Sequence, residues 1–223
     1  MNYSIDELKK FMGSEFDETL DIYRTSYSPV ETKPTEMVTN LLITDSNYHL
    51  FVVKGEESVV AMALLYRFDD LKTCLLDYMA VAKGQQRKGI GRSLLLYLLE
   101  FFRQRIDVPV GMLLEIQKED VEDIAERKDR SDRIRFYNSL GAKNMSGVRY
   151  LVPPQAGSEP EETYLMIIPT RRINSIPRES VLRNVQSIYS RVYQYTKGDL
   201  LTRVSESVTD PVAIAPVIIS RPS

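Results

Sequence analysis

The chain of 223 residues contains one cysteine, Cys74, and one histidine, His49. One cysteine excludes an intramolecular disulfide framework and a metal site built from several cysteines. Cys74 lies in an apolar run, which favours a buried, unreactive thiol over a nucleophile. His49 lies between Tyr48 and Leu50 and is accompanied by no Ser, Cys or second His arrangement. We therefore expect His49 to be a structural strand residue rather than a ligand or a base.

Long hydrophobic runs and a large net charge are also absent. No apolar run approaches the roughly 18–20 residues of a membrane span, and the first residues, MNYSIDELKK, lack the apolar region of a signal peptide. We therefore expect no membrane span and a cytoplasmic location. A net charge of −2 and a pI near 5.6 argue against general affinity for nucleic acid. Hydrophobic content of 43% and charged content of 27% are typical of a soluble globular protein, and the length predicts one domain with an appendage.

The stretch from Leu75 to Phe102 predicts a strand, a glycine-containing turn and a helix. The segment from Leu75 to Ala82 is short and mostly apolar, as a buried strand would be. The segment from Gly84 to Gly91 is a basic turn. Apolar residues then recur on one wide helical face, at Leu94, Leu95, Leu98, Leu99 and Phe102.

This turn suits an anion. A helix start leaves backbone N–H groups unpaired and carries partial positive charge. Gly89 and Gly91 remove the Cβ atoms that would keep a phosphate away, and Arg87, Lys88 and Arg92 add charge. The glycines alone equally fit an ordinary strand-to-helix turn with a solvated basic face.

Two known phosphate-binding loops are excluded, because each lacks residues that it requires. Gly84 and Gly89 have the spacing of a Walker A loop, but Ile90-Gly91 stands where Lys-Ser/Thr is required. Gly89 and Gly91 begin like a dinucleotide fingerprint, but Leu94 stands where the third glycine is required.

The remaining hexapeptide from Gln86 to Gly91, QRKGIG, resembles the Q/R-x-x-G-x-G/A pyrophosphate loop of the GNAT superfamily of acyl-coenzyme A-dependent N-acyltransferases. As in that family, an apolar strand ending Met79-Ala80-Val81 precedes the loop and a Leu-rich helix follows it. A second segment from Arg135 to Ala142, RFYNSLGA, resembles the F-Y-x-x-x-G-F segment near the end of the family's domain, with Ala142 in place of the usual aromatic residue. The resemblance covers roughly residues 14–169.

The order of the predicted elements also resembles the family. We expect helices at 17–27 and 35–44, strands at 47–54, 59–66 and 71–81, a strand at 108–117, a helix at 131–140, and strands at 145–152 and 164–168. The charged stretch 118–133 is expected to be a solvated face with a short helix in its first half, rather than an amine-attracting patch. The resemblance implies a mixed α/β (α+β) fold. Its central twisted sheet would have six to seven mostly antiparallel strands with a parallel splayed pair in the middle, flanked by about four helices.

In the resembled family a primary amine attacks the thioester of acetyl-CoA directly. Tyr137 matches the tyrosine that often serves as general acid, and the alternative is that it only packs on the sheet. Asp77 and Glu115 lie on predicted central strands, where a carboxylate is expensive unless paired or solvated, so each is a candidate base. The sequence does not decide between them, and a salt bridge to Arg135 or Arg149 is the alternative for Glu115.

The resemblance also implies where the donor binds. The backbone N–H of Met79 or Val81 would stabilise the oxyanion. The same strand would hold the pantetheine arm, and the N–H groups from Arg87 to Arg92 would hold the pyrophosphate. The implied cofactor-binding residues are Met79, Ala80, Val81, Gln86, Arg87, Lys88, Gly89, Ile90, Gly91, Arg92 and Asn138. Acetyl-CoA is thus the implied cosubstrate, with no metal. The asparagine that many members carry before the tyrosine is missing from residues 127–133.

From Arg171 onward the resemblance ends. We predict a GNAT acyltransferase domain at 1–170 and a C-terminal extension at 171–223, made of an amphipathic helix at 177–195 and an apolar tail. Ser175 would cap this helix and Pro177 would lie in its first turn. Its apolar stripe must pack on the chain's own sheet, which we favour, or on a second subunit in a homodimer. The tail at 211–223 is expected to dock on the core or on a partner as an extended strand.

The function implied is transfer of an acetyl group to a primary amine, with a small-molecule or peptide acceptor, no nucleic-acid partner and no membrane span. A longer-chain N-acyltransferase and a non-catalytic acyl-CoA-binding interaction module are the alternatives. The acceptor could be a protein N-terminus, a lysine, a polyamine, an amino acid or an antibiotic.

Overall fold

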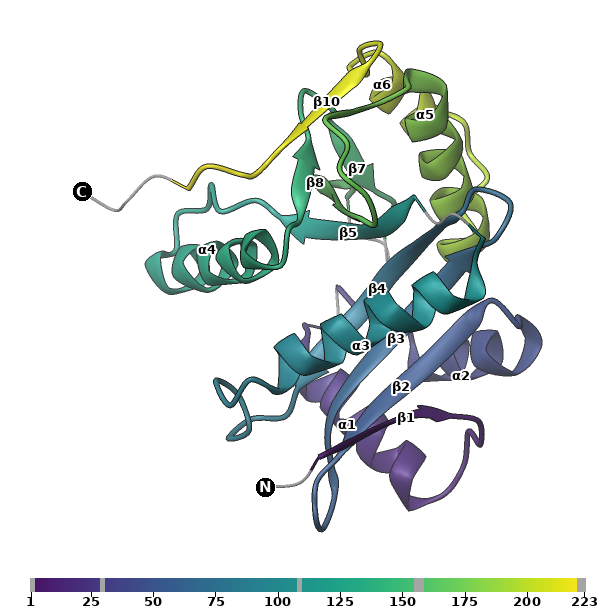
Figure 1. The fold of residues 1–223 in the computed structure, drawn as a ribbon, viewed down its shortest axis with the longest axis vertical. Helices are drawn as coiled ribbons and strands as arrows, with labels where there is room; N and C mark the ends of the chain where they lie inside the picture. The colour runs from purple at the N-terminus through teal and green to yellow at the C-terminus, as the bar shows by residue number, and fades with distance from the viewer. Residues whose placement is uncertain (1–2, 29–30, 108–109, 155–158, 220–223) are drawn as a thin grey trace. The chain divides into compact units, whose positions relative to one another are not determined.

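The computed structural model describes residues 3–28, 31–107, 110–154 and 159–219, and the chain forms two compact units (Figure 1). The first unit comprises the described residues up to 68 and those at 74–107. The second comprises residues 69–73, 110–154 and 159–219.

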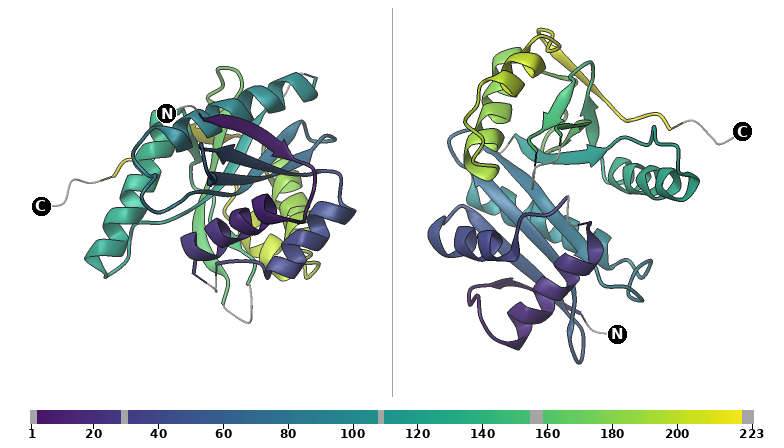
Figure 2. Two further views of the ribbon diagram at one scale, coloured as in Figure 1. Left: turned by 90° about the horizontal axis from the view of Figure 1, so that it is seen from below. Right: turned by 180° about the vertical axis from the view of Figure 1, so that it is seen from behind.

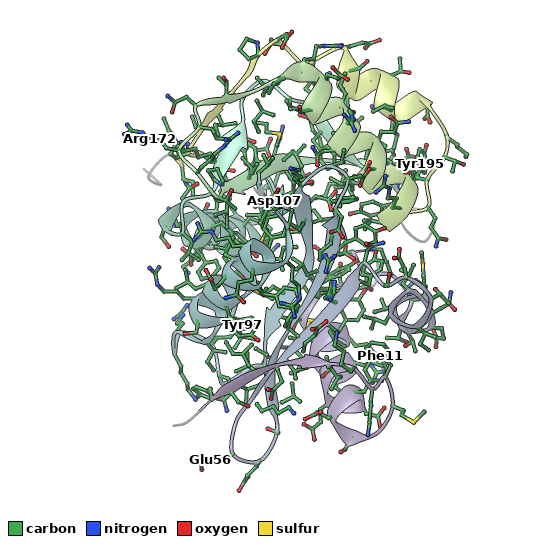
Figure 3. The ribbon with its side chains drawn as sticks, turned by 45° about the vertical axis from the view of Figure 1, so that its right-hand side comes forward. Phe11, Glu56, Tyr97, Asp107, Arg172 and Tyr195 are labelled. Carbon is green, nitrogen blue, oxygen red and sulfur yellow. The ribbon has the colours of Figure 1, made fainter. Side chains whose placement is uncertain are left out.

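The sheet of the first unit is ordered β1-β2-β3-β4. Its strands are β1 (Ser4–Leu8), β2 (Tyr48–Lys54), β3 (Val59–Phe68) and β4 (Thr73–Val81). Strand β2 pairs antiparallel with both β1 and β3 and is buried along nearly its whole length, as its unbroken apolar pattern predicts. The turn between β2 and β3 is at the tip of a long hairpin, where Glu56 is labelled in Figure 3.

Helices cover both faces of this sheet. Helices α1 (Ser14–Ser26) and α2 (Thr35–Thr44) lie on one face and α3 (Ile90–Arg105) lies on the other (Figures 1 and 2). The predicted apolar face of α3 is confirmed as its buried face: Leu94, Leu95, Leu98 and Phe102 are inaccessible to solvent, and Leu99 is nearly so.

The sheet of the second unit is built around β8 (Glu161–Pro169), which pairs antiparallel with β5 (Gly111–Gln117), β6 (Lys143–Met145) and β7 (Tyr150–Val152). Strand β10 (Val212–Ala215) joins β6 to β9 (Ser175–Ile176). Gly111 is the first residue of β5 and lies opposite Pro169 of β8. A Cβ atom there would lie 2.7 Å from Ile167 Cγ1 and from the Ile168 carbonyl oxygen, so glycine is required.

The second unit's helices are α4 (Ile124–Ser139), α5 (Arg178–Ser187), the π-helix η1 (Ile188–Val192) and α6 (Asp199–Ser205). The apolar stripe of the extension is confirmed to pack within the chain, since Val181, Val185, Ile188 and Val192 are fully buried. The expectation that the tail docks as a strand is confirmed for Val212–Ala215.

Several predicted boundaries were wrong. Helix α4 begins at Ile124 rather than at Ser131, because Asp123 caps it by accepting the N–H of Glu126. The predicted strand at 145–152 is two short strands, separated by a turn at Gly147, whose φ is +80°.

The extension also differs from the prediction in three places. Ser175 lies in β9 and does not cap α5, whose N-cap position is Pro177. The helix ends at Val192 rather than Tyr195, because its last turn is a π-helix. Residues 108–109 of a predicted strand, 29–30 and 155–158 of two loops, and 220–223 of the tail lie outside the described residues.

The mixed α/β class is confirmed, with ten strands and six α-helices in the described ranges instead of six to seven strands and about four helices. Strand β1 was not predicted, because it is only five residues long, carries two adjacent carboxylates and lies at a sheet edge. The domain boundary at residue 170 remains a prediction. No helix in the described part of the chain is long and apolar enough to cross a membrane.

Candidate functional site

The predicted pyrophosphate loop of the first unit forms a tight turn between β4 and α3. Three residues of the turn have a left-handed backbone: Gly84 (φ +83°), Arg87 (φ +63°) and Gly89 (φ +82°). Gly89 is the N-cap residue of α3, and no side chain caps the helix. Ser93 N–H makes the first bond of the helix, to the Gly89 carbonyl oxygen, so the N–H groups before it have no acceptor inside the helix. A Cβ atom at Gly89 would meet no atom within 4 Å, so the structure is open on that side of Gly89.

The basic side chains of this turn are exposed to solvent. Arg87, Lys88 and Arg92 are all exposed, and the Lys88 ammonium donates to Gln85 Oε1 at 2.8 Å. Gln86 reaches back to the Val81 carbonyl oxygen at 3.3 Å. Free N–H groups, the helix dipole and these cations together favour a bound phosphate.

Strand β4 presents one row of backbone groups away from β3. Ala82 N–H donates to the Val60 carbonyl oxygen, so the even-numbered residues direct their backbone groups towards β3. Backbone direction alternates along a strand, and Met79 and Val81 therefore face the opposite edge. Tyr27 already occupies part of this edge: its hydroxyl donates to the Met79 carbonyl oxygen (2.7 Å) and accepts from the Met79 N–H (2.9 Å).

Asp77 forms a buried ion pair on the same strand. Its two carboxylate oxygens accept hydrogen bonds from Lys33 Nζ at 2.8 and 2.9 Å, and both side chains are at most 1% exposed. Burial raises the pKa of the Asp77 carboxyl, although Lys33 opposes this change. Tyr23 and Tyr78 bond the backbone of Lys33, so this pair and its neighbours anchor the connection between α1 and α2.

Lys33 was not recognised from the sequence. A carboxylate on a buried strand signals that a partner must exist, but the signal does not say which of many cations supplies it.

Glu115, on β5 in the second unit, is held by two phenols. In the β5/β8 register Gln117 lies opposite Thr163, and in the β7/β8 register Thr163 lies opposite Tyr150. Glu115 and Tyr150 therefore share one face of the sheet, and the Tyr150 hydroxyl donates to Glu115 Oε1. Tyr193 donates to Glu115 Oε2 at 2.7 Å.

The alternative that Glu115 forms a salt bridge with Arg135 or Arg149 is wrong. Arg135 pairs with Asp132, and Arg149 pairs with Glu162.

Tyr137 lies near the end of α4 and is 7% exposed. The backbone around it is fixed by the helix end, since Leu140 N–H and Ala142 N–H both donate to the Tyr137 carbonyl oxygen and Gly141 takes a φ of +87°. Burial raises the pKa of the Tyr137 phenol to about 12, so the hydroxyl is protonated near neutral pH.

Asn138 contacts the C-terminal tail. Its Nδ2 donates to the Val217 carbonyl oxygen at 2.9 Å, whereas its Oδ1 is buried without a hydrogen-bond partner among the described residues. A cofactor contact through this side chain remains a prediction.

The first unit thus brings the glycine turn and the backbone groups of Met79 and Val81 together on consecutive elements, and the second unit brings Glu115 together with Tyr150 and Tyr193. Among the described residues no cluster of three or more His, Cys, Asp and Glu side chains could hold a metal ion. The role of Tyr193 was not predicted, because nothing local marks a tyrosine 78 positions away as a partner of Glu115.

Comparisons with known structures show the same fold. An acetyltransferase of the GNAT family from Bacteroides thetaiotaomicron, described as putative in its name, aligns over 80% of this chain and 91% of its own, with 18% identity and a TM-score of 0.65. A probable acetyltransferase from Staphylococcus epidermidis aligns over 76% of this chain and all of its own, with 12% identity and a TM-score of 0.58. The ribosomal-protein-S18-alanine N-acetyltransferase from Escherichia coli aligns over 77% of this chain and 96% of its own, with 20% identity and a TM-score of 0.53.

A comparison with curated protein sequences finds no match. The family model of the acetyltransferase (GNAT) family matches residues 16–141, which is more than half of the chain and includes both the glycine turn and Tyr137. The chain therefore belongs to the acetyltransferase (GNAT) family.

Proposed function

We propose that this protein is an N-acetyltransferase that transfers the acetyl group of acetyl-CoA to a primary amine of a small molecule or a peptide. The observation that carries the proposal is the turn at Gly89. Its left-handed backbone, the uncapped start of α3 and the exposed cations make a fitting cradle for the pyrophosphate of coenzyme A.

The reaction needs three groups besides the donor site. The amine nitrogen attacks the thioester carbonyl carbon, the new C–N bond forms, and the C–S bond breaks to release coenzyme A. One amine proton goes to a base, directly or through water, because an ammonium has no lone pair and amines of the lysine type have a pKa of about 10.4. The developing oxyanion needs an N–H donor, and the leaving thiolate needs a proton.

Glu115 is the base in this proposal. Its two oxygens are held by phenols, which are neutral, whereas the Asp77 side chain is 1% exposed and both of its oxygens are paired with the Lys33 ammonium. A base must reach the proton that it removes, and the Asp77 carboxylate is enclosed.

Tyr137 donates a hydrogen bond to the leaving sulfur in this proposal. Since burial raises the pKa of the Tyr137 phenol to about 12, well above the value of about 8.5 for a thiol, complete proton transfer from the phenol to the thiolate is uphill. A hydrogen bond that stabilises the departing thiolate needs no complete transfer, so the buried phenol remains suited to the role.

Val81 is the oxyanion donor in this proposal, because no side chain of the described residues is seen to bond its N–H. Met79 can serve only if its N–H exchanges the Tyr27 hydroxyl for the substrate.

Thermal unfolding with acetyl-CoA, desulfo-CoA or ATP tests the donor site. A ligand at about 100 times its Kd stabilises the folded state by roughly 2.7 kcal/mol. We expect both coenzyme A forms to raise the melting temperature and ATP to leave it unchanged. Gly89→Asp should abolish the shift, since it adds a negative side chain in front of the free N–H groups.

Gly147→Asp is the matched control. Gly147 has nearly the same φ, +80° against +82°, and equally open surroundings, so the backbone strain is comparable while the turn is untouched. Its shift with acetyl-CoA should equal that of the wild type. A loss of the shift in both variants, or in neither, would contradict the assignment of Gly89.

Transfer is then measured with spermidine, lysine amide and an alanine-starting tetrapeptide as acceptors. Turnover with any of them supports the proposal. Binding without turnover would favour an acyl-CoA-binding module, and turnover only with a longer acyl-CoA would favour the longer-chain N-acyltransferase.

A further inference from the structure

The C-terminal extension supplies a hydrogen bond to the carboxylate that the proposed function uses as its base. Tyr193 lies 52 residues beyond the end of the family match at residue 141, and its hydroxyl is 2.7 Å from Glu115 Oε2. Glu115 and Tyr193 both belong to the second unit.

The π-helix η1 sets the position of Tyr193. The Tyr193 N–H donates to the carbonyl oxygen of Ile188, five residues back, whereas an α-helix would use Tyr189. Tyr189 instead accepts the N–H of Tyr195, and Gln194 between them takes a φ of +54°. The helix therefore ends in one wide turn, and this turn gives Tyr193 a different direction from the one that a regular α-helix would give it.

Buried contacts hold this turn in place. Ile188 and Val192 are fully buried, and the Tyr189 hydroxyl donates to the Leu151 carbonyl oxygen. The Tyr189 ring packs against that of Tyr150, with centroids 5.9 Å apart. The strand that carries Tyr150 and the turn that carries Tyr193 are thus joined directly beside Glu115.

The two phenols act on different oxygens of Glu115. Tyr150 donates to Oε1 and Tyr193 donates to Oε2, which fixes both the rotation of the carboxylate and its position above β5. Hydrogen bonds donated to a carboxylate stabilise its charged form, which is the form that accepts a proton. Small misplacements of a reacting group cost large factors in rate.

We propose that Tyr193 of the C-terminal extension is a positioning residue for Glu115, so that the extension takes part in acetyl transfer rather than only stabilising the fold. This inference rests on the proposed function. It makes the wide turn at residues 188–192 a part of the catalytic apparatus, although that turn lies outside residues 16–141, which the family model matches.

Tyr193→Phe removes the hydroxyl and keeps the ring, and Tyr195→Phe is the matched control. The Tyr195 hydroxyl bonds Asp199 in the same extension, and Figure 3 labels Tyr195 at the end of this helical segment. The acceptor is whichever of spermidine, lysine amide and the alanine-starting tetrapeptide gives the highest kcat/KM. We expect Tyr193→Phe to lower kcat about fivefold to fiftyfold with the KM for acetyl-CoA unchanged, and Tyr195→Phe to behave as the wild type.

A double variant separates positioning from general destabilisation. In the Glu115→Gln background, whose activity is already low, Tyr193→Phe should change kcat less than twofold, because there is no base left to position. An equal loss of kcat in both backgrounds, or an unchanged kcat in Tyr193→Phe, would overturn the inference and leave the proposed function standing. If the wild type transfers acetyl to none of the three amines, the proposed function fails and the inference falls with it.

Discussion

The Tyr27 hydroxyl makes two hydrogen bonds to the backbone of Met79, one to its carbonyl oxygen and one from its N–H. Tyr27 follows helix α1, and Met79 lies 52 residues later on β4, with its backbone groups directed away from β3. These are the backbone groups that the family resemblance assigns to the pantetheine arm and the oxyanion. The side chain therefore occupies, in the first unit, a position at which the donor is expected.

Tyr27→Phe should destabilise the protein less when acetyl-CoA is bound than when it is absent. Loss of two hydrogen bonds costs about 1–2 kcal/mol, or a melting temperature lower by roughly 2–8 °C in a chain of this length. If the donor takes over the Met79 N–H, the variant recovers part of that loss. Thermal unfolding with and without saturating acetyl-CoA measures the difference.

Tyr23→Phe is the control for this experiment. Its hydroxyl bonds the Lys33 carbonyl oxygen in the same unit and not Met79, so its destabilisation should be equal in both conditions. An equal loss for Tyr27→Phe with and without acetyl-CoA would show that the donor does not use the Met79 N–H.

Removing one partner of the buried pair of Lys33 and Asp77 should cost far more stability than removing both. Lys33→Met or Asp77→Leu alone leaves an uncompensated buried charge and should cost about 3–5 kcal/mol. The double variant should lose at most about 1 kcal/mol, since well-packed apolar residues often replace a buried ion pair without loss. Urea unfolding of the four proteins measures the free energies.

The same double variant also separates the two candidate bases. Because we assign the base to Glu115, the double variant should retain acetyl transfer within about threefold of the wild type. A folded double variant without activity would return Asp77 to the role of base.

Tyr137→Phe should lower turnover at least tenfold and leave acetyl-CoA binding intact. The phenyl ring preserves the packing of a side chain that is 7% exposed, so only the proton or hydrogen-bond donor is lost. Steady-state kinetics give kcat, and the thermal shift with acetyl-CoA reports binding. Tyr164→Phe, which loses only a bond to Glu119, should keep the turnover of the wild type. Unchanged turnover in Tyr137→Phe would remove this residue from the mechanism.

Local patterns in the sequence predicted much of this structure. The stripe from Leu94 to Phe102 predicted the buried face of α3, and the predicted helix end at residue 140 lies within one residue of the end of α4 at Ser139. Both depend on residues within two or three helical turns, where side-chain spacing and backbone φ are fixed by neighbours in the chain.

Contacts between distant residues were not predictable in the same way. Lys33 meets Asp77 across 44 positions, and Tyr193 meets Glu115 across 78. Burial requires that each carboxylate find partners, but many lysines and tyrosines satisfy that requirement equally in the sequence. The π-turn that directs Tyr193 differs from an α-helix by a single hydrogen-bond register, which no periodicity of five residues can reveal.

The stability of the first unit should fall as the pH drops below about 6.5, and His49 should be the cause. Its side chain is 8% exposed, its Nδ1 lies 2.6 Å from Glu7 Oε1, and its Nε2 is buried without a partner among the described residues. Burial lowers the pKa of His49; Glu7 opposes this shift, and the charges of Arg67 and Lys9 add to it.

The direction of this pH dependence follows from proton binding in the two states. The folded protein binds the imidazole proton less tightly than the unfolded chain, whose histidine has a pKa of about 6.5. Acidification through and below that value therefore favours unfolding, until His49 protonates in the folded state as well.

Since the chain has one histidine, His49→Asn removes every imidazole while its amide can still donate to Glu7. Urea unfolding at pH 7, 6 and 5 should show a smaller loss of stability in His49→Asn than in the wild type. Asp77, whose pKa is raised, acts with the opposite sign but is present in both proteins, so its effect cancels in the comparison. Equal pH dependence in the two proteins would mean that His49 is not the group responsible.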